Sequence, residues 1–220
     1  MLTARGIEKY YGELHVLKGV DITIQKGEIL SIVGSSGAGK TTLLHILGTL
    51  DKADKGEIFF NDLRVDQLKG KQLAEYRNRN AGFVFQFHHL LPEFSALENV
   101  CMPGWIAGQS GAALEKKANE LLDRLGILNR ASHRPAEMSG GEQQRVAVAR
   151  ALINGPAIIF ADEPTGNLDS TNANELHKLF LQLRDEMQQT FVIVTHNEEL
   201  AGMSDRILRL KDGHWGKEQA

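Results

Sequence analysis

The stretch GSSGAGKTT, residues 34–42, limits what this chain can fold into more than any other feature. It fits the pattern G-x-x-x-x-G-K-[ST] and joins an apolar run at 27–34, which predicts a buried strand, to a helical pattern at 39–50. Glycines let such a loop curl so that its N–H groups point at phosphate oxygens, and the helix N-terminus adds positive potential. The stretch therefore predicts a triphosphate site between strand and helix, in preference to an ordinary glycine-rich turn.

The residues of this loop have different predicted roles. Gly34, Gly37 and Gly39 are expected to let the backbone curl around the phosphates. Lys40 supplies a positive charge for the β- and γ-phosphates, and the Thr41 hydroxyl can ligate Mg²⁺. The predicted nucleotide-binding residues of the loop are Gly34, Ser35, Ser36, Gly37, Ala38, Gly39, Lys40, Thr41 and Thr42.

A second motif, AIIFADEP at 157–164, adds the acidic groups that hydrolysis requires. Its apolar run ends in Asp162, which is expected to hold Mg²⁺ through water, and Glu163 can polarise the attacking water. By itself, an Asp-Glu pair after a strand is usually a solvated turn. Because the phosphate loop is also present, the two motifs together predict hydrolysis of ATP or GTP.

Short apolar runs alternate with helical patterns along the chain. Apolar runs that end in polar residues suit parallel strands covered on both faces, with ligands at their carboxyl ends. The section 97–153 is mainly helical in pattern, which predicts a helical subdomain inserted into an α/β core. One helix there places Leu114, Ala118, Leu121, Leu122 and Leu125 on one face. Other strands are expected at 56–62, 81–86, 157–162 and 190–196, and a helix with caps at Ser170 and Thr171.

Length, charge and hydropathy exclude several classes of protein. With 220 residues, the chain is expected to form one domain, residues 1–220. The net charge of −3 gives no basic footprint, so no nucleic-acid partner is expected. The N-terminus lacks the apolar segment of a signal peptide, and no apolar run approaches the roughly 18 residues that cross a bilayer. The chain is therefore expected in the cytoplasm, with membrane contact through partners only.

Further motifs carry a family resemblance. The segment MSGGEQQRVAVARAL at 138–152 resembles the signature sequence of ATP-binding-cassette (ABC) proteins, and it precedes the acidic motif as in that family. GNLD at 166–169 resembles the D-loop of the family, and VTH at 194–196 resembles its switch histidine. Gln86 matches the Q-loop glutamine, and Tyr11 matches the aromatic residue that stacks on adenine. The resemblance covers essentially the whole chain.

The resemblance implies an α/β fold of the P-loop NTPase (RecA-like) class. Its parts are a mostly parallel sheet, an N-terminal antiparallel β region and an inserted helical subdomain, at approximately 87–153 in this chain. The nucleotide that the resemblance implies is ATP, with Mg²⁺ as cofactor. The implied ligands of Mg²⁺ are Thr41, Gln86 and Asp162.

The resemblance also assigns roles outside the phosphate loop. His196 is expected to sense the γ-phosphate and to orient the water, which makes it a catalytic residue beside Glu163. Gln86 is expected to contact ATP as well as the metal ion. Tyr11 is the expected adenine-stacking residue, although Tyr10 is adjacent and could stack instead.

The signature segment implies that two copies of the chain bind ATP together. In the family, two cassettes form a head-to-tail dimer with two ATP molecules at the interface. Ser139, Gly140, Gly141 and Asp169 are then expected to contact the ATP of the other copy. A serine and two glycines that open a helix also offer N–H donors to a γ-phosphate. Ser139 and Glu142 have the spacing of a capping box, and both roles are compatible.

The stretch QFHHLLPEF at 86–94 has three alternative interpretations. A zinc site is disfavoured, because adjacent side chains on an extended segment diverge and no further ligand lies nearby. A core segment suits Phe87 and Leu90 but not the polar residues between and after them. The mixture of polar and apolar residues beside Gln86 favours a surface that reports the nucleotide state to a partner. This surface is formed by His88, His89, Leu90 and Leu91.

The resemblance extends to one branch of the family. QFHHLLPEFSALENVCMP is similar to the same region in the ATPases of lipoprotein-releasing transporters. It implies a peripheral subunit at the cytoplasmic face of the inner membrane. With integral membrane partners, this subunit would power lipoprotein release towards a periplasmic carrier. The alternatives are the ATPase of a macrolide-export or cell-division complex, or a soluble ABC ATPase that acts on DNA or ribosomes.

Overall fold

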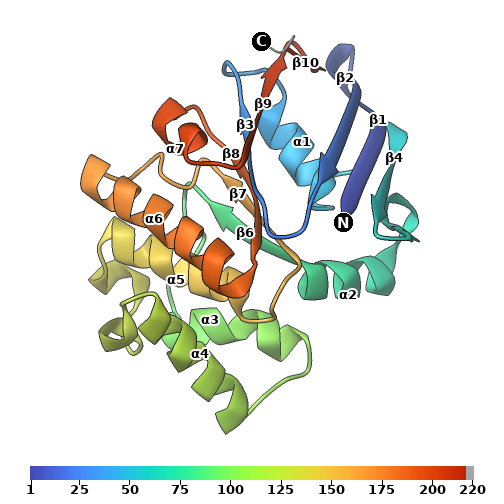
Figure 1. The fold of residues 1–220 in the computed structure, drawn as a ribbon. Coiled ribbons are helices and arrows are strands. Elements are labelled where there is room, and N and C mark those ends of the chain that lie inside the picture. Colours follow the sequence, from blue (N-terminus) through green and yellow to red (C-terminus); the bar gives the residue numbers. More distant parts are fainter. Residues whose placement is uncertain (217–220) are drawn as a thin grey trace. The chain divides into compact units, whose positions relative to one another are not determined.

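The computed structural model describes residues 1–216, which divide into two compact units. The first unit contains Met1–Ala74 and the chain from Leu183 onward, and the second is Glu75–Gln182 (Figure 1). The single-domain prediction for residues 1–220 stays a prediction, and residues 217–220 lie outside the described part of the chain. Two helices run across the boundaries between the units, α2 (Gly70–Asn80) and α6 (Ser170–Met187).

The first unit contains two sets of paired strands. One is an antiparallel sheet in the order β2-β1-β4-β5, and the other contains β10, β9, β3 and β8 in that order. Strand β3 pairs in parallel with both β8 and β9, and β10 pairs with β9 in the antiparallel direction. The elements are β1 (Leu2–Tyr11), β2 (Leu14–Ile24), β3 (Ile29–Val33), α1 (Lys40–Leu47), β4 (Lys55–Phe60), β5 (Leu63–Arg64), the 3-10 turn Val65–Gln67, β8 (Thr190–Val194), α7 (Glu198–Gly202), β9 (Arg206–Lys211) and β10 (His214–Trp215).

The parallel strands of the first unit form its buried centre. Every residue of β3 and of β8 is buried, as expected for apolar runs covered on both faces. Their register pairs Ile29 with Phe191 and Ile32 with Val194. The strands predicted at 27–34 and 190–196 are therefore confirmed, as is the antiparallel β region near the N-terminus.

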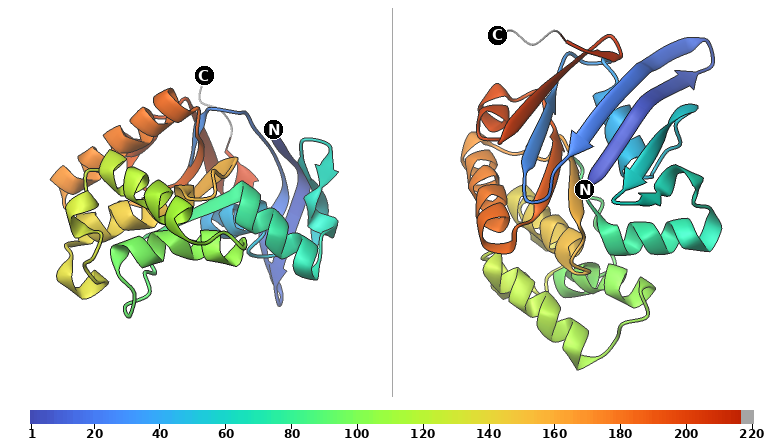
Figure 2. Two further views of the ribbon diagram at one scale, coloured as in Figure 1. Left: turned by 90° about the horizontal axis from the view of Figure 1, so that it is seen from below. Right: turned by 45° about the vertical axis from the view of Figure 1, so that its right-hand side comes forward.

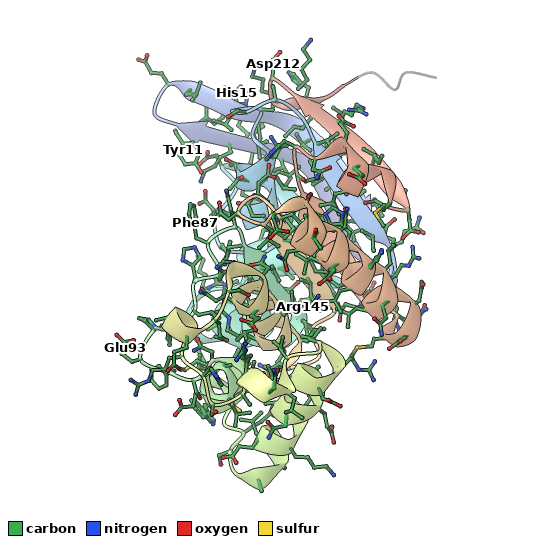
Figure 3. All side chains as sticks on the ribbon, turned by 90° about the vertical axis from the view of Figure 1, so that its left-hand side faces the viewer. Tyr11, His15, Phe87, Glu93, Arg145 and Asp212 are labelled. Atoms are coloured by element: carbon green, nitrogen blue, oxygen red, sulfur yellow. The ribbon has the colours of Figure 1, made fainter. Side chains whose placement is uncertain are left out.

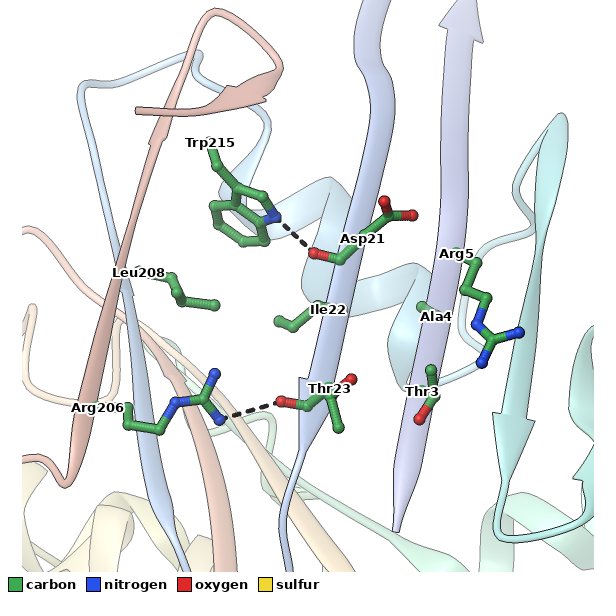
Figure 4. Close-up of a pocket in the computed structure, with 9 residues that line it drawn as sticks. All are labelled: Thr3, Ala4, Arg5, Asp21, Ile22, Thr23, Arg206, Leu208 and Trp215. Carbon is green, nitrogen blue, oxygen red and sulfur yellow. Dashed lines mark hydrogen bonds between the residues drawn. The ribbon is translucent and has the colours of Figure 1, made fainter. Parts of the chain in front are cut away.

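The C-terminal hairpin covers the edge of the antiparallel sheet. The indole N–H of Trp215 donates to the Asp21 carbonyl at 2.6 Å, and Arg206 donates to the Thr23 carbonyl at 3.1 Å (Figure 4). Both carbonyls belong to β2, the edge strand of its sheet. The two bonds satisfy backbone groups that an edge strand would otherwise expose to another chain. An open cavity of about 660 Å³ lies beside these residues.

The second unit combines a parallel strand pair with a group of helices. Its elements are β6 (Ala81–Phe85), α3 (Ala96–Ile106), α4 (Ala112–Arg124), α5 (Gly140–Leu152), β7 (Ile158–Asp162) and the 3-10 turns Leu128–Arg130 and Pro135–Glu137. Helices α3, α4 and α5 pack on one another, and α5 also packs on β6 (Figure 2). The mainly helical section is confirmed. The predicted apolar face of α4 is buried, together with Leu125 directly after the helix.

The predicted start of α6 is wrong in one detail. The sequence suggested caps at Ser170 and Thr171, but the helix already begins at Ser170. The side chain of Asp169 accepts the Asn172 backbone N–H at 2.9 Å, which is the bond of an N-cap residue. Asp169 therefore caps α6, because its carboxylate is a stronger acceptor than the hydroxyls that follow it.

Gly82 of β6 gives the first testable prediction. A Cβ at this position would lie 2.7 Å from the Ala151 carbonyl oxygen and 3.2 Å from Ile159 Cγ1. Backbone atoms cannot rotate away, so we expect Gly82→Ala to lower the free energy of unfolding by about 1–3 kcal/mol. Urea unfolding of the purified variant measures the change.

Gly202→Ala is the matched control for Gly82→Ala. Its added methyl group would meet no described atom within 4 Å. We expect this control to leave the free energy of unfolding unchanged or to raise it by up to about 1 kcal/mol. Equal stability of Gly82→Ala and the parent chain would contradict the close packing of α5 on β6.

Candidate active site

The phosphate loop of the first unit depends on two glycines with positive φ. Gly37 has φ 78° and Gly39 has φ 99°, in the left-handed region that side chains rarely adopt. A Cβ on Gly39 would also lie 2.9 Å from Leu17 Cδ2 and 3.2 Å from the Val16 carbonyl oxygen. The backbone of β2 therefore leaves no room for a larger residue at the point where the loop enters α1.

The N-terminus of α1 offers backbone donors to an anion. Its N-cap is Gly39, which has no side chain to cap the helix. Lys40 is 8% exposed, and its ammonium donates to the carbonyl oxygens of Gly34 at 2.9 Å and of Ser35 at 3.0 Å. A helix start without a side-chain cap and a positive charge thus lie within one loop, and this combination binds phosphate groups.

The two candidate aromatic residues have different surroundings. Tyr10 stacks on His15, with ring centroids 4.0 Å apart. Tyr11 is 52% exposed, and its hydroxyl donates to Asp51 at 2.8 Å (Figure 3). Burial, followed by the Asp51 acceptor, raises the pKa of the Tyr11 hydroxyl. Tyr11 also forms a hydrogen bond with Thr42, so the structure brings the predicted stacking residue next to the phosphate loop.

His196 lies at the same edge of the parallel strands as the phosphate loop. It follows Thr195, whose N–H donates to the Ile32 carbonyl of β3 at 3.2 Å. Because β3 and β8 are parallel, both the phosphate loop and His196 leave the carboxyl ends of their strands. The imidazole is exposed, and the next residue, Asn197, caps α7.

In the second unit, Gln86 and Asp162 lie at the carboxyl ends of paired strands. Phe85, the last residue of β6, is in register with Asp162, the last residue of β7. The Gln86 amide donates to the Asn167 side chain at 3.0 Å, and Asn167 donates back to the Gln86 carbonyl at 3.1 Å. A Cβ on Gly166 would lie 2.8 Å from Gln86 Nε2, so the glycine permits this approach.

Glu163 has an unusual backbone conformation. Its φ is 46°, a left-handed value that costs free energy in a residue other than glycine. The following Pro164 disfavours the right-handed helical conformation at this position. A hydrogen bond from the Gly166 N–H to the Glu163 carbonyl at 3.0 Å closes the turn, and the buried Gln144 donates to the Pro164 carbonyl at 2.8 Å. These bonds hold the strained backbone of Glu163 in place.

The start of α5 forms the capping box that the sequence predicts. Glu142 Oε2 accepts the Ser139 N–H at 2.8 Å, and Ser139 Oγ accepts the Glu142 N–H at 3.3 Å. Glu142 Oε1 also accepts a bond from Arg130 Nε at 2.7 Å. This arginine, followed by the Ser139 N–H, holds the pKa of Glu142 below its ordinary value.

The residues predicted to act on a second copy lie close together. A Cβ on Gly141 would lie 2.5 Å from Asn172 Oδ1, and Asn172 donates to Asp169 at 2.6 Å. The N-termini of α5 and α6 therefore meet. Ser139, Gly140 and Asp169 are exposed at these two helix starts.

We use the name coupling segment for residues 87–94. Phe87 is 67% exposed, which excludes it from the core, and Leu91 is 40% exposed (Figure 3). The segment is nevertheless held in place, because the buried Asn99 accepts the Leu91 N–H at 2.8 Å and donates to the Leu91 carbonyl at 3.1 Å. Arg150 binds the carbonyl oxygens of His88 and His89. Burial, followed by the charge of Arg150, lowers the pKa of His88.

Several of these residues are not identifiable from the sequence as part of the site. Asn99, Arg150 and Asn167 act through hydrogen bonds to distant backbone or side chains, and the motif patterns do not show such bonds. Gln144 lies inside the signature segment, but its bonds to the Phe85 and Pro164 carbonyls are visible only in the structure. Phe87 was compatible with a core position, so its exposure could not be predicted.

Sequence comparison identifies the family of the chain. The protein-family model described as ABC transporter matches residues 17–166. The chain belongs to the ABC transporter family. It is an ATP-binding and ATP-hydrolysing cassette, and the family membership predicted from its motifs is confirmed.

The cassette has close curated relatives. It is 58% identical over 213 residues to the lipoprotein-releasing system ATP-binding protein LolD of Bacteroides thetaiotaomicron, with 97% of this chain and 98% of the relative covered. It is 59% identical over 213 residues to the protein of the same name from Porphyromonas gingivalis, with 97% of each covered. The same name is carried by a relative from Idiomarina loihiensis, which is 49% identical over 223 residues, with 100% of this chain and 98% of the relative covered.

Solved structures support the fold assignment. A dimeric structure of a bacterial ABC transporter cassette matches the cassette with a TM-score of 0.89 at 41% identity, covering 99% of this chain and 97% of that one. A dimeric post-hydrolysis cassette bound to ADP and Pi matches with a TM-score of 0.89 at 40% identity, covering 100% of this chain and 98% of that one. The predicted α/β fold is confirmed. Within residues 1–216, no helix combines the length and the apolar character needed to cross a membrane.

The capping box of the cassette gives a pH-dependent prediction. Arg130 and the Ser139 N–H lower the pKa of Glu142 below 4.5, so its contribution to stability is complete above pH 4.5 and is lost as the pH falls through the lowered pKa. Glutamine can keep the capping-box bond but loses the ion pair with Arg130, so we expect Glu142→Gln to reduce the free energy of unfolding by about 0.2–1 kcal/mol at neutral pH. Urea unfolding at neutral pH and in steps below pH 4.5 measures the difference.

The control for this prediction is Arg130→Gln, which removes the other member of the ion pair. We expect its destabilisation to show the same dependence on pH as that of Glu142→Gln. If the difference in the free energy of unfolding between each variant and the parent chain stayed constant down to the lowest pH, the ionic contribution to this cap would be contradicted.

Proposed function

We propose that this cassette is the ATPase subunit of a lipoprotein-releasing ABC transporter. It acts as a peripheral protein at the cytoplasmic face of the inner membrane and drives integral membrane partners, which pass lipoproteins towards a periplasmic carrier. The observation that carries this proposal is the identity of 58% and 59%, across 97% of the chain, to proteins named for lipoprotein release.

ATP binds to the first unit through the phosphate loop and Tyr11. The exposed ring of Tyr11 stacks on adenine, and backbone N–H groups at the start of α1 bind phosphate oxygens. Lys40 then exchanges its loop carbonyls for the β- and γ-phosphates, which are stronger acceptors. The nucleotide contacts that we propose are Tyr11, Gly34, Ser35, Ser36, Gly37, Ala38, Gly39, Lys40, Thr41, Thr42 and Gln86.

The donor set fits Mg²⁺ as the cofactor. Thr41, Gln86 and Asp162 offer hydroxyl, amide and carboxylate oxygens, the ligands that this ion prefers. The Gln86 amide nitrogen is occupied by Asn167, and Gln86 Oε1 accepts no bond from the described residues, so it can face a cation. Mg²⁺ bound there would neutralise charge on the β- and γ-phosphates. The described residues contain no group of three or more His, Cys, Asp or Glu side chains suited to a metal ion, so phosphate oxygens and water would complete its shell.

Glu163 and His196 carry the hydrolysis. Glu163 accepts a proton from the attacking water, whose oxygen bonds to the γ-phosphorus as the bond to the β–γ bridging oxygen breaks. The turn fixes the backbone of Glu163, from which the carboxylate reaches the water. His196 donates a hydrogen bond to a γ-phosphate oxygen and orients the water, so its side chain contacts ATP before and not after hydrolysis.

A second copy completes each site in a head-to-tail dimer. Ser139, Gly140 and Gly141 present the N-terminus of α5 to the γ-phosphate of the other copy, and Asp169 lies beside them. This arrangement is supported by the exposure of the two helix starts and by the dimeric state of the two similar cassettes.

The coupling segment is the surface that the membrane partner contacts. His88, His89, Leu90 and Leu91 directly follow Gln86, so one loop contains both an ATP contact and a partner contact. Phe87 extends this surface, because it is exposed on the same segment. A partner contact can change with the nucleotide only if it differs in free energy between the two states.

Glu163→Gln tests the catalytic assignment. An amide can orient water but is a poor base, so we expect hydrolysis to fall by about 10²–10⁴-fold while ATP affinity is retained. The ATP-bound dimer should then accumulate, because it opens only after the γ-phosphate is lost. Steady-state ATPase assays and size-exclusion chromatography with ATP and Mg²⁺ measure the two effects.

Ser139→Arg in the same background is the control for the dimer. A bulky cation at this exposed position is expected to prevent dimer formation and to leave nucleotide binding by the monomer intact. If the monomer of Ser139→Arg bound no ATP, the proposed contact with the second copy would be wrong. A Glu163→Gln protein that stayed monomeric at high concentration with ATP would also count against it.

Replacing Leu90 and Leu91 by alanine tests the coupling segment and the cargo together. If both side chains are buried by the partner, their loss removes roughly 1.5–3 kcal/mol each from the contact. In the reconstituted complex, partner-stimulated ATPase and lipoprotein release are expected to fall together, while basal turnover of the isolated cassette remains. The measurements are ATPase rate, lipoprotein transfer to the carrier and melting temperature.

Leu63→Ala is the matched control for this double variant, because Leu63 is 46% exposed on the antiparallel sheet. We expect this control to retain stimulated ATPase and lipoprotein release. A Leu90, Leu91 variant that melts early and hydrolyses no ATP would mean that these leucines belong to the core. A parent complex whose ATPase did not respond to lipoprotein would contradict the proposed cargo.

A further inference from the structure

Arg150 forms a bidentate hydrogen-bond contact with the backbone of the coupling segment. Its Nη1 donates to the His89 carbonyl at 2.6 Å, and its Nη2 donates to the His88 carbonyl at 2.7 Å. Burial lowers the pKa of Arg150, but a guanidinium keeps its charge throughout the physiological range. The contact is therefore a permanent charge-assisted pair of bonds.

The backbone of the two histidines is bent so that Arg150 can reach both carbonyls. His88 has φ 20° and His89 has φ 48°, values that residues with a side chain rarely adopt. Successive carbonyl groups of an extended strand point to opposite sides, whereas these two converge on one guanidinium. The bend costs free energy, and such strain persists only where the surroundings hold it, as Arg150 does here.

Arg150 belongs to the helix that begins at the proposed contact with the second copy. Ser139 is the N-cap of α5, and Arg150 lies near its end. With a rise of 1.5 Å per residue, the two are about 16 Å apart along a helix that is rigid over this length. Between them, the buried Gln144 donates to the carbonyls of Phe85 and Pro164, which flank Gln86 and Glu163. One helix thus connects the signature serine, the catalytic turn and the coupling segment.

We propose that Arg150 is the positioning residue that makes the coupling segment move with α5. This inference rests on the proposed function, since it takes Ser139 as the ATP contact and the coupling segment as the partner contact. When ATP draws the N-terminus of α5 towards the second copy, the helix carries Arg150 with it. The His88 and His89 carbonyls follow, because the bidentate bonds leave the backbone little freedom to slide. Asn99 holds the Leu91 end of the segment to α3.

Hydrogen exchange measured by mass spectrometry tests this role without a membrane partner. The Glu163→Gln protein is compared with and without ATP and Mg²⁺, and exchange is followed at 139–143 and at 87–94. We expect ATP to slow exchange in both regions. Adding Arg150→Gln is expected to leave the ATP effect at 139–143 and to reduce the effect at 87–94 by about fivefold or more.

Arg150→Lys and Arg145→Gln are the companion variants. Lysine keeps the charge and can reach one carbonyl, so it is expected to restore part of the ATP effect at 87–94. Arg145 lies on the same helix (Figure 3), and it binds Glu175 at 2.6 Å and the Leu125 carbonyl at 3.1 Å. Among the described residues, it forms no hydrogen bond to the coupling segment. Arg145→Gln is therefore expected to keep the ATP effect in both regions.

The outcomes separate this inference from the proposal beneath it. An unchanged ATP effect at 87–94 in Arg150→Gln would overturn the role of Arg150 and leave the dimer intact. No ATP effect at 139–143 in the Glu163→Gln parent would overturn the dimer, and the inference would fall with it. If Arg150→Gln does not fold, Arg150→Lys is the deciding variant. We expect Arg150→Lys to reduce the ATP effect at 87–94 by about twofold, and an unchanged ATP effect would overturn the role of Arg150.

The complete transporter gives a second readout. In the reconstituted complex, we expect Arg150→Gln to lower the partner-stimulated kcat by about tenfold while the KM for ATP stays close to that of the parent. Arg150→Lys is expected to recover part of the loss. A fall in stimulated kcat of the same size in Arg145→Gln would show that any damage to α5 has this effect, and the specific role of Arg150 would then be wrong.

Discussion

Parallel pairing of strands is the constraint on which the chemistry of this protein depends. In the first unit, β3 and β8 run in the same direction, so the phosphate loop and His196 leave their strands at the same edge. In the second unit, β6 and β7 place Gln86 and Asp162 in the same way. Polar loops can gather at such an edge because the strands themselves are apolar and buried, and their backbone groups are already paired.

Backbone groups, more than side chains, form the binding surfaces at these edges. The start of α1 lacks a side-chain cap, and positive φ values at Gly37 and Gly39 turn its loop inward. The start of α5 is capped by Ser139 and Glu142, yet Ser139 remains exposed. Helix N-termini favour anions wherever their donors are reachable. In the dimer that we propose, each unit would contribute one such helix start to a shared ATP site.

The predictable part of the site consists of residues whose role follows from their neighbours in the chain. Lys40 and Asp162 could be identified because a glycine-rich loop and an apolar run precede them. The capping box at Ser139 followed from a spacing of three residues. Asp169 was predicted as a contact to a second copy but not as the cap of α6, because Ser170 and Thr171 are equally plausible caps in the sequence.

The sequence by itself determined the strands, the helical section, the phosphate loop and the family, because each depends on residues close together in the chain. Tertiary structure alone decided which polar side chains hold these parts in place. Arg150 binds carbonyls 61 and 62 residues away, and Asn167 binds Gln86 across 81 residues. The tertiary structure also decided that Phe87 is exposed. The physical reason is that a hydrogen bond or a buried contact depends on distance in space, which hydropathy patterns and motif spacing do not encode.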